Sequence, residues 1–143
     1  MGTVTSPRVR TRLDIKESSR PRPAATVLVV DDDSAFRALV CEMLEASGHR
    51  VLAAQNALEA HQISKTFPGR IDLLVVDMRM PLMGGLALAE QLRKKRPLCF
   101  LFMSGHAPVI GAGIPWPPRA AAFILKAFTQ AQLLGKVQEV LRS

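Results

Sequence analysis

The stretch VLVVDDDS, residues 27–34, decides the fold of this 143-residue chain. Its four apolar residues form a run too short and too β-branched for a helix, so they predict a buried strand. Three carboxylates and a serine that can cap a helix follow, and burying such acids is costly unless a cation lies beside them. A second run, residues 72–76 (DLLVV), ends in the same way at Asp77. Two parallel strands would bring these acids into one crevice at the carboxyl edge of a sheet.

The rest of the chain alternates predicted helices and strands. Strands are predicted over residues 50–54, 71–76, 98–103 and 121–125. Helices are predicted from Ser34 to a stop at Gly48, from the cap Asn56 to about Lys65, over residues 86–94 and after the cap Thr129. Three glycines and four prolines between 104 and 120 predict a loop with at most one helical turn. The alternation predicts a parallel sheet with helices on both faces.

Composition favours one domain with a basic tail. Residues 1–25, rich in Pro, Ser, Thr and Arg, are predicted to be disordered, and residues 26–143 to form the domain. The tail carries much of the net charge of +7, but it has no aromatic residues for base stacking, so we do not predict nucleic acid binding.

Hydropathy and cysteine usage predict a cytoplasmic location without a membrane partner. No apolar run approaches the roughly 18 residues that span a bilayer, and the N-terminus lacks an apolar signal core. Cys41 and Cys99 fall within a predicted helix and a predicted strand, which favours reduced core thiols over a disulfide or a metal pair.

Four separated motifs, taken together, resemble the receiver (response-regulator) domain of two-component signalling. They are VVDDD at 29–33, DMRMP at 77–81 with the glycine pair 84–85, MSG at 103–105 and FILKAF at 123–128. The likeness covers about residues 26–142 and is greatest to receivers fused to hybrid histidine kinases. It implies a flavodoxin-like (βα)5 doubly wound sheet in the order 2-1-3-4-5, with the fourth helix shortened or irregular here.

The resemblance implies that Asp77 is the phosphoacceptor and that Mg²⁺ is the cofactor. The cation would be held by the carboxylates of Asp32 and Asp77 and the backbone carbonyl of Arg79, with Asp31 acting mainly through water. Asp33 would point away and help to cap the following helix. The phosphoryl donor would be a histidine kinase or a histidine phosphotransfer protein.

The resemblance gives roles to five further side chains. Ser104 would hydrogen-bond a phosphoryl oxygen, and Lys126 would contact another. Phe123 would be an aromatic switch, although a buried core phenylalanine is the competing interpretation. Arg79 and His106 would tune how quickly water removes the phosphoryl group.

Three departures from the family pattern qualify these expectations. Ala127 stands where a proline that favours a cis bond is usual, which would loosen the loop that aims Lys126. Gly84 replaces a common acid. The proline-rich stretch 108–118 removes most of a helix that output partners often contact, so we do not expect an output mode or dimerisation through that helix.

The leading hypothesis is a phosphoacceptor switch that catalyses only its own phosphorylation and dephosphorylation, with no output domain in this chain. A relay intermediate or phosphate sink for a histidine phosphotransfer domain stays open. A constitutive pseudo-receiver is disfavoured by the intact Asp77 and Lys126. A flavodoxin-like cofactor binder is disfavoured because acids, rather than a phosphate-cradling loop, follow the first strand.

Overall fold

The computed structural model describes residues 25–105 and 121–142, which form one parallel sheet flanked by helices. The strands are β1 (Thr26–Val30), β2 (Arg50–Ala54), β3 (Leu73–Asp77), β4 (Cys99–Ser104) and β5 (Ala121–Leu125). The helices are α1 (Ser34–Ala46), α2 (Ala57–Thr66), α3 (Gly85–Arg93) and α4 (Gln130–Arg142). The strand order β2-β1-β3-β4-β5 confirms the predicted topology.

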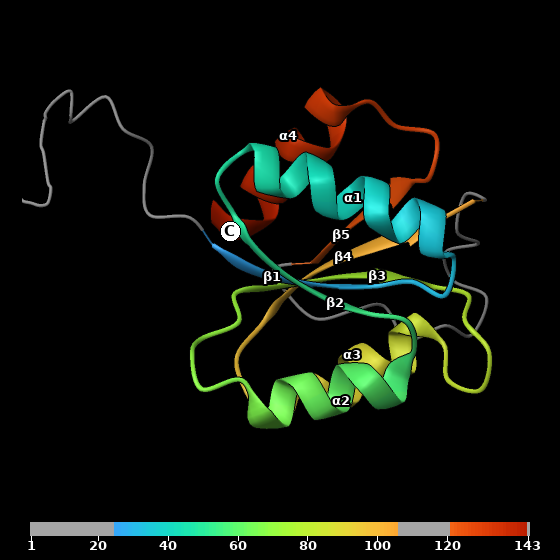
Figure 1. Ribbon diagram of the computed structural model, residues 1–143, viewed down its shortest axis with the longest axis vertical. Helices are drawn as coiled ribbons and strands as arrows, with labels where there is room; N and C mark the ends of the chain where they lie inside the picture. The colour runs from blue at the N-terminus through green and yellow to red at the C-terminus, as the bar shows by residue number, and fades with distance from the viewer. Residues whose placement is uncertain (1–24, 106–120, 143) are drawn as a thin grey trace, which may run out of the picture.

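Among the described residues, α1 and α4 cover one face of the sheet, and α2 and α3 cover the other (Figure 1). Because both faces are covered, successive residues 27–30 of β1 and 73–76 of β3 are all apolar, with no alternation of apolar and polar positions. Alternate side chains of β1 and β3 therefore pack into two hydrophobic cores. The core on the α2–α3 side contains Leu28, Val30, Leu74 and Val76. The core on the α1–α4 side contains Val27, Val29, Leu73 and Val75.

Side-chain caps set where the helices begin. Asp33 Oδ1 accepts a hydrogen bond from Phe36 N at 3.1 Å, so the cap of α1 is Asp33 and Ser34 is the first helical residue. Asn56 caps α2 as predicted, and Thr129 Oγ1 accepts from Gln132 N at 3.1 Å in the first turn of α4. Gly48, with φ +91°, follows α1 in the left-handed conformation expected of a helix stop.

Small shifts at element ends have one consequence for the site. β3 ends at Asp77, which pairs in register with Met103 of β4. The backbone of Asp77 is therefore part of the sheet and not of the loop that follows. The predicted strand started two residues earlier and ended one residue before Asp77.

The expectations for the tail before residue 25 and for residues 106–120 lie outside the described residues. No helix in the described ranges is long and apolar enough to cross a membrane.

Candidate functional site

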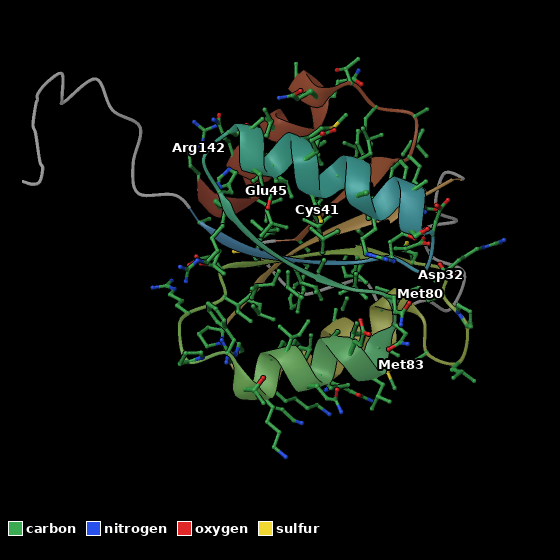
Figure 2. The ribbon with its side chains drawn as sticks, viewed as in Figure 1. Asp32, Cys41, Glu45, Met80, Met83 and Arg142 are labelled. Carbon is green, nitrogen blue, oxygen red and sulfur yellow. The ribbon has the colours of Figure 1, made fainter. Side chains whose placement is uncertain are left out.

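Three carboxylates meet at the carboxyl ends of two neighbouring strands. Asp31 and Asp32 follow β1, Asp77 ends β3, and Val30 lies beside Val76 in the parallel register. One carboxylate oxygen from each acid lies within 4.8 Å of the other two. Asp31 and Asp77 are buried, whereas Asp32 is exposed, at the same end of the sheet as the loop that follows β3 (Figure 2). The predicted convergence of the acids is confirmed.

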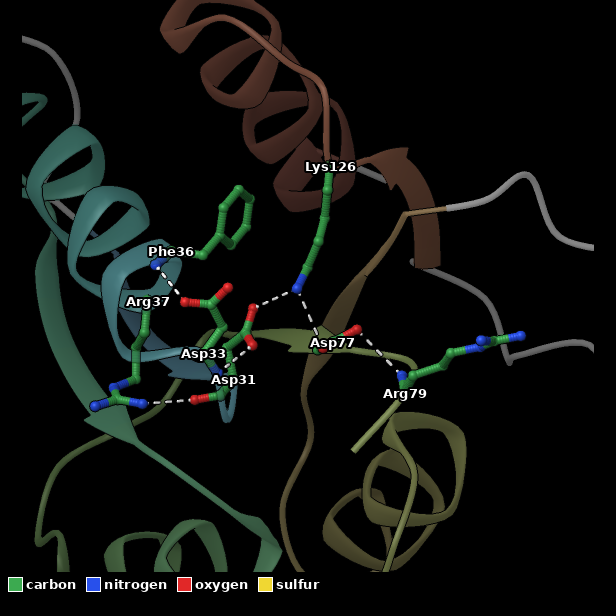
Figure 3. A network of polar contacts seen from close by, with 7 residues as sticks. All are labelled: Asp31, Asp33, Phe36, Arg37, Asp77, Arg79 and Lys126. Carbon is green, nitrogen blue, oxygen red and sulfur yellow. Dashed lines mark hydrogen bonds and ion pairs between the residues drawn. The ribbon is translucent and has the colours of Figure 1, made fainter. Parts of the chain in front are cut away.

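Lys126 supplies the positive charge of the site from the end of β5. Its Nζ lies 2.9 Å from Asp31 Oδ2 and 3.1 Å from Asp77 Oδ2 (Figure 3). Its backbone N donates to Ser104 O at 2.8 Å, so the end of β4 fixes where the lysine leaves the sheet. The side chain is half-buried, and burial alone would lower the pKa of Lys126. The contacts with the two negatively charged carboxylates outweigh burial and raise that pKa, so the ammonium stays charged.

Asp31 is the most enclosed of the acids. Its Oδ1 accepts from Asp33 N at 2.9 Å, and its backbone carbonyl accepts from the Arg37 guanidinium at 2.7 Å. Its buried Oδ2 receives no well-directed hydrogen bond from the described residues, because the short contact with Lys126 is an ion pair of poor hydrogen-bond geometry. Burial raises the pKa of Asp31, although the Asp33 N–H and Lys126 partly oppose that shift.

The donor set fits a hard divalent cation. It includes three carboxylates, with one buried carboxylate oxygen that has no directed hydrogen bond within the described ranges, and Mg²⁺ and Ca²⁺ take oxygen ligands of this kind. Arg79 N donates to Asp77 Oδ1 at 3.1 Å, which holds the loop after β3 against the carboxylate. The exposed Arg79 guanidinium extends away from Asp31 and Asp77 (Figure 3).

Ser104 and Phe123 lie where the motifs indicated. Ser104 is the last residue of β4 and is buried beside Leu125 of β5. Phe123 is half-buried, pairs in register with Phe102 and packs against the core on the α2–α3 side. This placement is compatible with both the switch and the core interpretation. The predicted tuning residue His106 lies outside the described residues.

Two residues at the site were not recognised from the sequence. Phe36 is one of the apolar residues of α1 and its place in the apolar pattern suggested no functional role, yet Lys126 Nζ lies over its ring, 4.6 Å from the centroid. Arg37, which holds the Asp31 carbonyl, was given no role. Both lie in the first turn of α1, directly after the acidic run. That position was the available signal, because a helix that follows a ligand-binding strand end presents its first turn to the site.

Comparisons with known proteins agree with this geometry. The family model described as the response regulator receiver domain matches residues 27–138. The chain is 35% identical over 120 residues to the sensor kinase CckA of Brucella abortus, covering 82% of this chain and 13% of that protein. It spans about half or less of the length of the first curated relatives that it matches.

Solved structures that share the fold include two that each cover about four fifths of this chain. One is the receiver domain of the hybrid histidine kinase CckA, with a TM-score of 0.68 and 29% identity, covering 82% of this chain and 99% of that one. The other is the response regulator TrrA of Thermotoga maritima in complex with Mg²⁺–BeF, with a TM-score of 0.68 and 30% identity, covering 81% and 98%.

Proposed function

This chain belongs to the response regulator receiver family of two-component signalling, and from that membership we propose that Asp77 is its phosphoacceptor. The observation that carries the proposal is the position of the Asp77 carboxylate, which lies close to two further acids and contacts the ammonium of Lys126. The proposed donor is a phosphohistidine on a histidine kinase or a histidine phosphotransfer protein. The proposed location of this exchange is the cytoplasm.

The proposed reaction moves one phosphoryl group between two side chains. A carboxylate oxygen of Asp77 attacks phosphorus and forms a P–O bond, while the P–N bond to the histidine breaks. The electron pair of that bond stays on the imidazole nitrogen, and the ring leaves as neutral imidazole when its other nitrogen carries the proton. The product is an acyl phosphate on Asp77, which water later hydrolyses to restore the carboxylate.

The neighbouring groups support this reaction by their charge and hydrogen-bonding capacity. Asp31, Asp32 and Asp77, with the Arg79 carbonyl, would hold Mg²⁺, which neutralises charge on the transferring phosphoryl group when it is bound. Lys126 already contacts Asp77 and would stay beside one phosphoryl oxygen. The Ser104 hydroxyl, at the end of the adjacent strand, would donate to another.

Modification of Asp77 would then change how this domain binds its partners. We propose Phe123 as the coupling residue, because it lies in β5 three residues before Lys126 and is only half-buried. A constitutive binding module without phosphorylation is not favoured, since the acids and the lysine converge on one site. The Arg79 side chain would set how quickly water removes the phosphoryl group from Asp77.

Incubation with acetyl phosphate and Mg²⁺, followed by intact mass spectrometry, tests this proposal. We expect one phosphoryl adduct on the wild-type chain and none on Asp77→Asn. The same incubation with EDTA should leave the wild type unmodified, because the acids would repel the donor without a cation. A wild type that stays unmodified, or an adduct that persists in Asp77→Asn, would remove Asp77 from this role.

A further inference from the structure

Phe36 links the lysine of the site to the first turn of α1. The Lys126 ammonium lies 4.6 Å from the centroid of its ring, within the roughly 6 Å at which cation–π attraction acts. The same ring meets Phe128 edge to face, with the centroids 5.5 Å apart and the planes at 67°. Phe36 therefore contacts the charged end of Lys126 and the ring two residues farther along the chain. Figure 3 shows the ring on the α1 side of the lysine side chain.

The position of the Phe36 ring is itself fixed by the acidic run. Asp33 Oδ1 accepts a hydrogen bond from Phe36 N, so the cap that begins α1 also holds the backbone beneath this ring. The adjacent Arg37 donates to the Asp31 carbonyl, which ties the same turn to the buried acid. The first turn of α1 is thus anchored at two points before the ring reaches Lys126.

Lys126 has a cation–π contact with Phe36 that does not depend on free carboxylates. Its other contacts in the site are the ion pairs with Asp31 and Asp77. A divalent cation on those carboxylates would compete for the same oxygens and would repel the ammonium. The Phe36 ring attracts the ammonium through its π face, which such a cation leaves free. Ala127, directly after the lysine, adds no ring constraint to this segment of backbone.

We propose that Phe36 is a positioning residue, which holds the Lys126 ammonium at the acidic site and thereby sets how fast Asp77 accepts a phosphoryl group. The effect on rate rests on the proposed function of Asp77, whereas the effect on the position of Lys126 does not. The two parts are therefore measured separately.

The position of Lys126 is measured by NMR of the full chain carrying ¹³C-labelled lysine. Because Lys126 Nζ lies over the Phe36 ring, the protons of the adjacent Cε group should resonate upfield of those of the exposed lysines. We expect this upfield shift to be lost in Phe36→Leu and kept in Phe36→Tyr, which retains the ring. Lys126→Arg identifies the signal. Thermal unfolding of each variant shows whether it is folded.

Phe67 offers a matched control at a different place in the fold. The Arg50 guanidinium lies over the Phe67 ring at 5.8 Å, so Phe67→Leu also removes a half-buried aromatic ring and a cation–π contact. We expect Phe67→Leu to leave the Lys126 signal and the phosphorylation rate unchanged. With acetyl phosphate and Mg²⁺, Phe36→Leu should gain the adduct about three- to tenfold more slowly than the wild type, and Phe36→Tyr at a near wild-type rate.

Each result decides one part of the proposal. An unchanged Lys126 signal in folded Phe36→Leu would overturn the positioning role, whatever the phosphorylation rates are. A lost signal with a wild-type rate would overturn the effect on phosphorylation. If the wild type gains no adduct, the role of Asp77 fails and the effect on rate fails with it, while the NMR comparison still decides whether Phe36 holds Lys126.

Discussion

The ammonium of Lys126 lies 3.1 Å from the nearer carboxylate oxygen of Asp77, although 49 positions separate the two residues in the sequence. The same ammonium contacts buried Asp31, so one positive charge serves two acids. Asp32 lies beside them, so three carboxylates face one ammonium. The site therefore has a net negative charge that a divalent cation would neutralise. The charge balance of the site therefore favours a cation and a lysine acting together, and each can be tested separately.

Asp32 should be needed for the cation but not for the fold. Its carboxylate is exposed, so Asp32→Asn should fold normally while Mg²⁺ affinity falls about tenfold or more, because a hard cation loses an anionic ligand. Titration calorimetry measures this. The neighbouring Asp33→Asn is the matched control, because Asn can still cap α1 and Asp33 lies outside the set of converging acids. Equal losses in the two variants would indicate general charge attraction in place of ligation.

Lys126→Met should separate metal binding from phosphorylation. Removing the ammonium removes a competitor for Asp31 and Asp77, so Mg²⁺ should bind about three- to tenfold more tightly. Phosphorylation by acetyl phosphate should nevertheless slow, because the phosphoryl oxygens lose their cationic contact. Calorimetry and intact mass measure the two effects on the same sample. Weaker Mg²⁺ binding in the variant would contradict the competition between lysine and cation.

The resemblance to receiver domains implied the sheet order, whereas the acidic cluster was predicted from a residue pattern that tertiary structure rarely overrides. The continuous apolar runs before Asp31 and Asp77 indicated strands covered on both faces. Parallel strands have their carboxyl ends at the same edge of a sheet, so the acids were expected to lie close together. The role of Phe36 was not predicted, because an apolar residue on a helical stripe looks the same whether it meets a core residue or a lysine. The C-terminal boundary of β3 was missed by one residue because a buried Asp is rare within strands.

Gly85 should be required because the chain there passes close to the backbone of Asp77. A Cβ at Gly85 would overlap the carbonyl oxygen of Asp77 and lie 3.0 Å from its carbonyl carbon. Gly85→Ala should therefore destabilise the fold by about 1–3 kcal/mol and weaken Mg²⁺ binding by moving Asp77. Gly135→Ala is the control, because a Cβ there meets nothing within 4 Å and alanine favours α4. Urea unfolding compares them, and equal stabilities would refute the close approach.

Asp31 should make the metal-free protein less stable at neutral pH. Burial raises the pKa of Asp31 above its ordinary 3.8, so the folded chain holds this proton more tightly than the unfolded chain does. That stabilisation is complete below pH 3.8 and is lost as the pH rises through the raised pKa. In EDTA, Asp31→Asn should therefore melt about 2–6 °C higher than the wild type at pH 7, with the gain shrinking toward pH 4. A lower melting temperature would mean that the ion pair with Lys126 outweighs burial.

Arg79 should lengthen the lifetime of the phosphorylated state. Its backbone N–H holds the Asp77 carboxylate, while its exposed guanidinium is free to swing back over a phosphoryl group and obstruct attacking water. Arg79→Ala keeps the backbone contact and removes the guanidinium, so autodephosphorylation should become several-fold faster. Arg79→Lys should be intermediate, because an ammonium supplies charge without the planar fork.

The decay of the phosphoryl adduct after removal of donor measures this lifetime by intact mass. Arg142→Ala is the control, because Arg142 is also exposed but lies near the end of α4, away from the acids (Figure 2). An unchanged lifetime in Arg79→Ala would show that the guanidinium does not reach the phosphoryl group. Equal acceleration in both variants would instead point to the lower net charge of the chain as the cause.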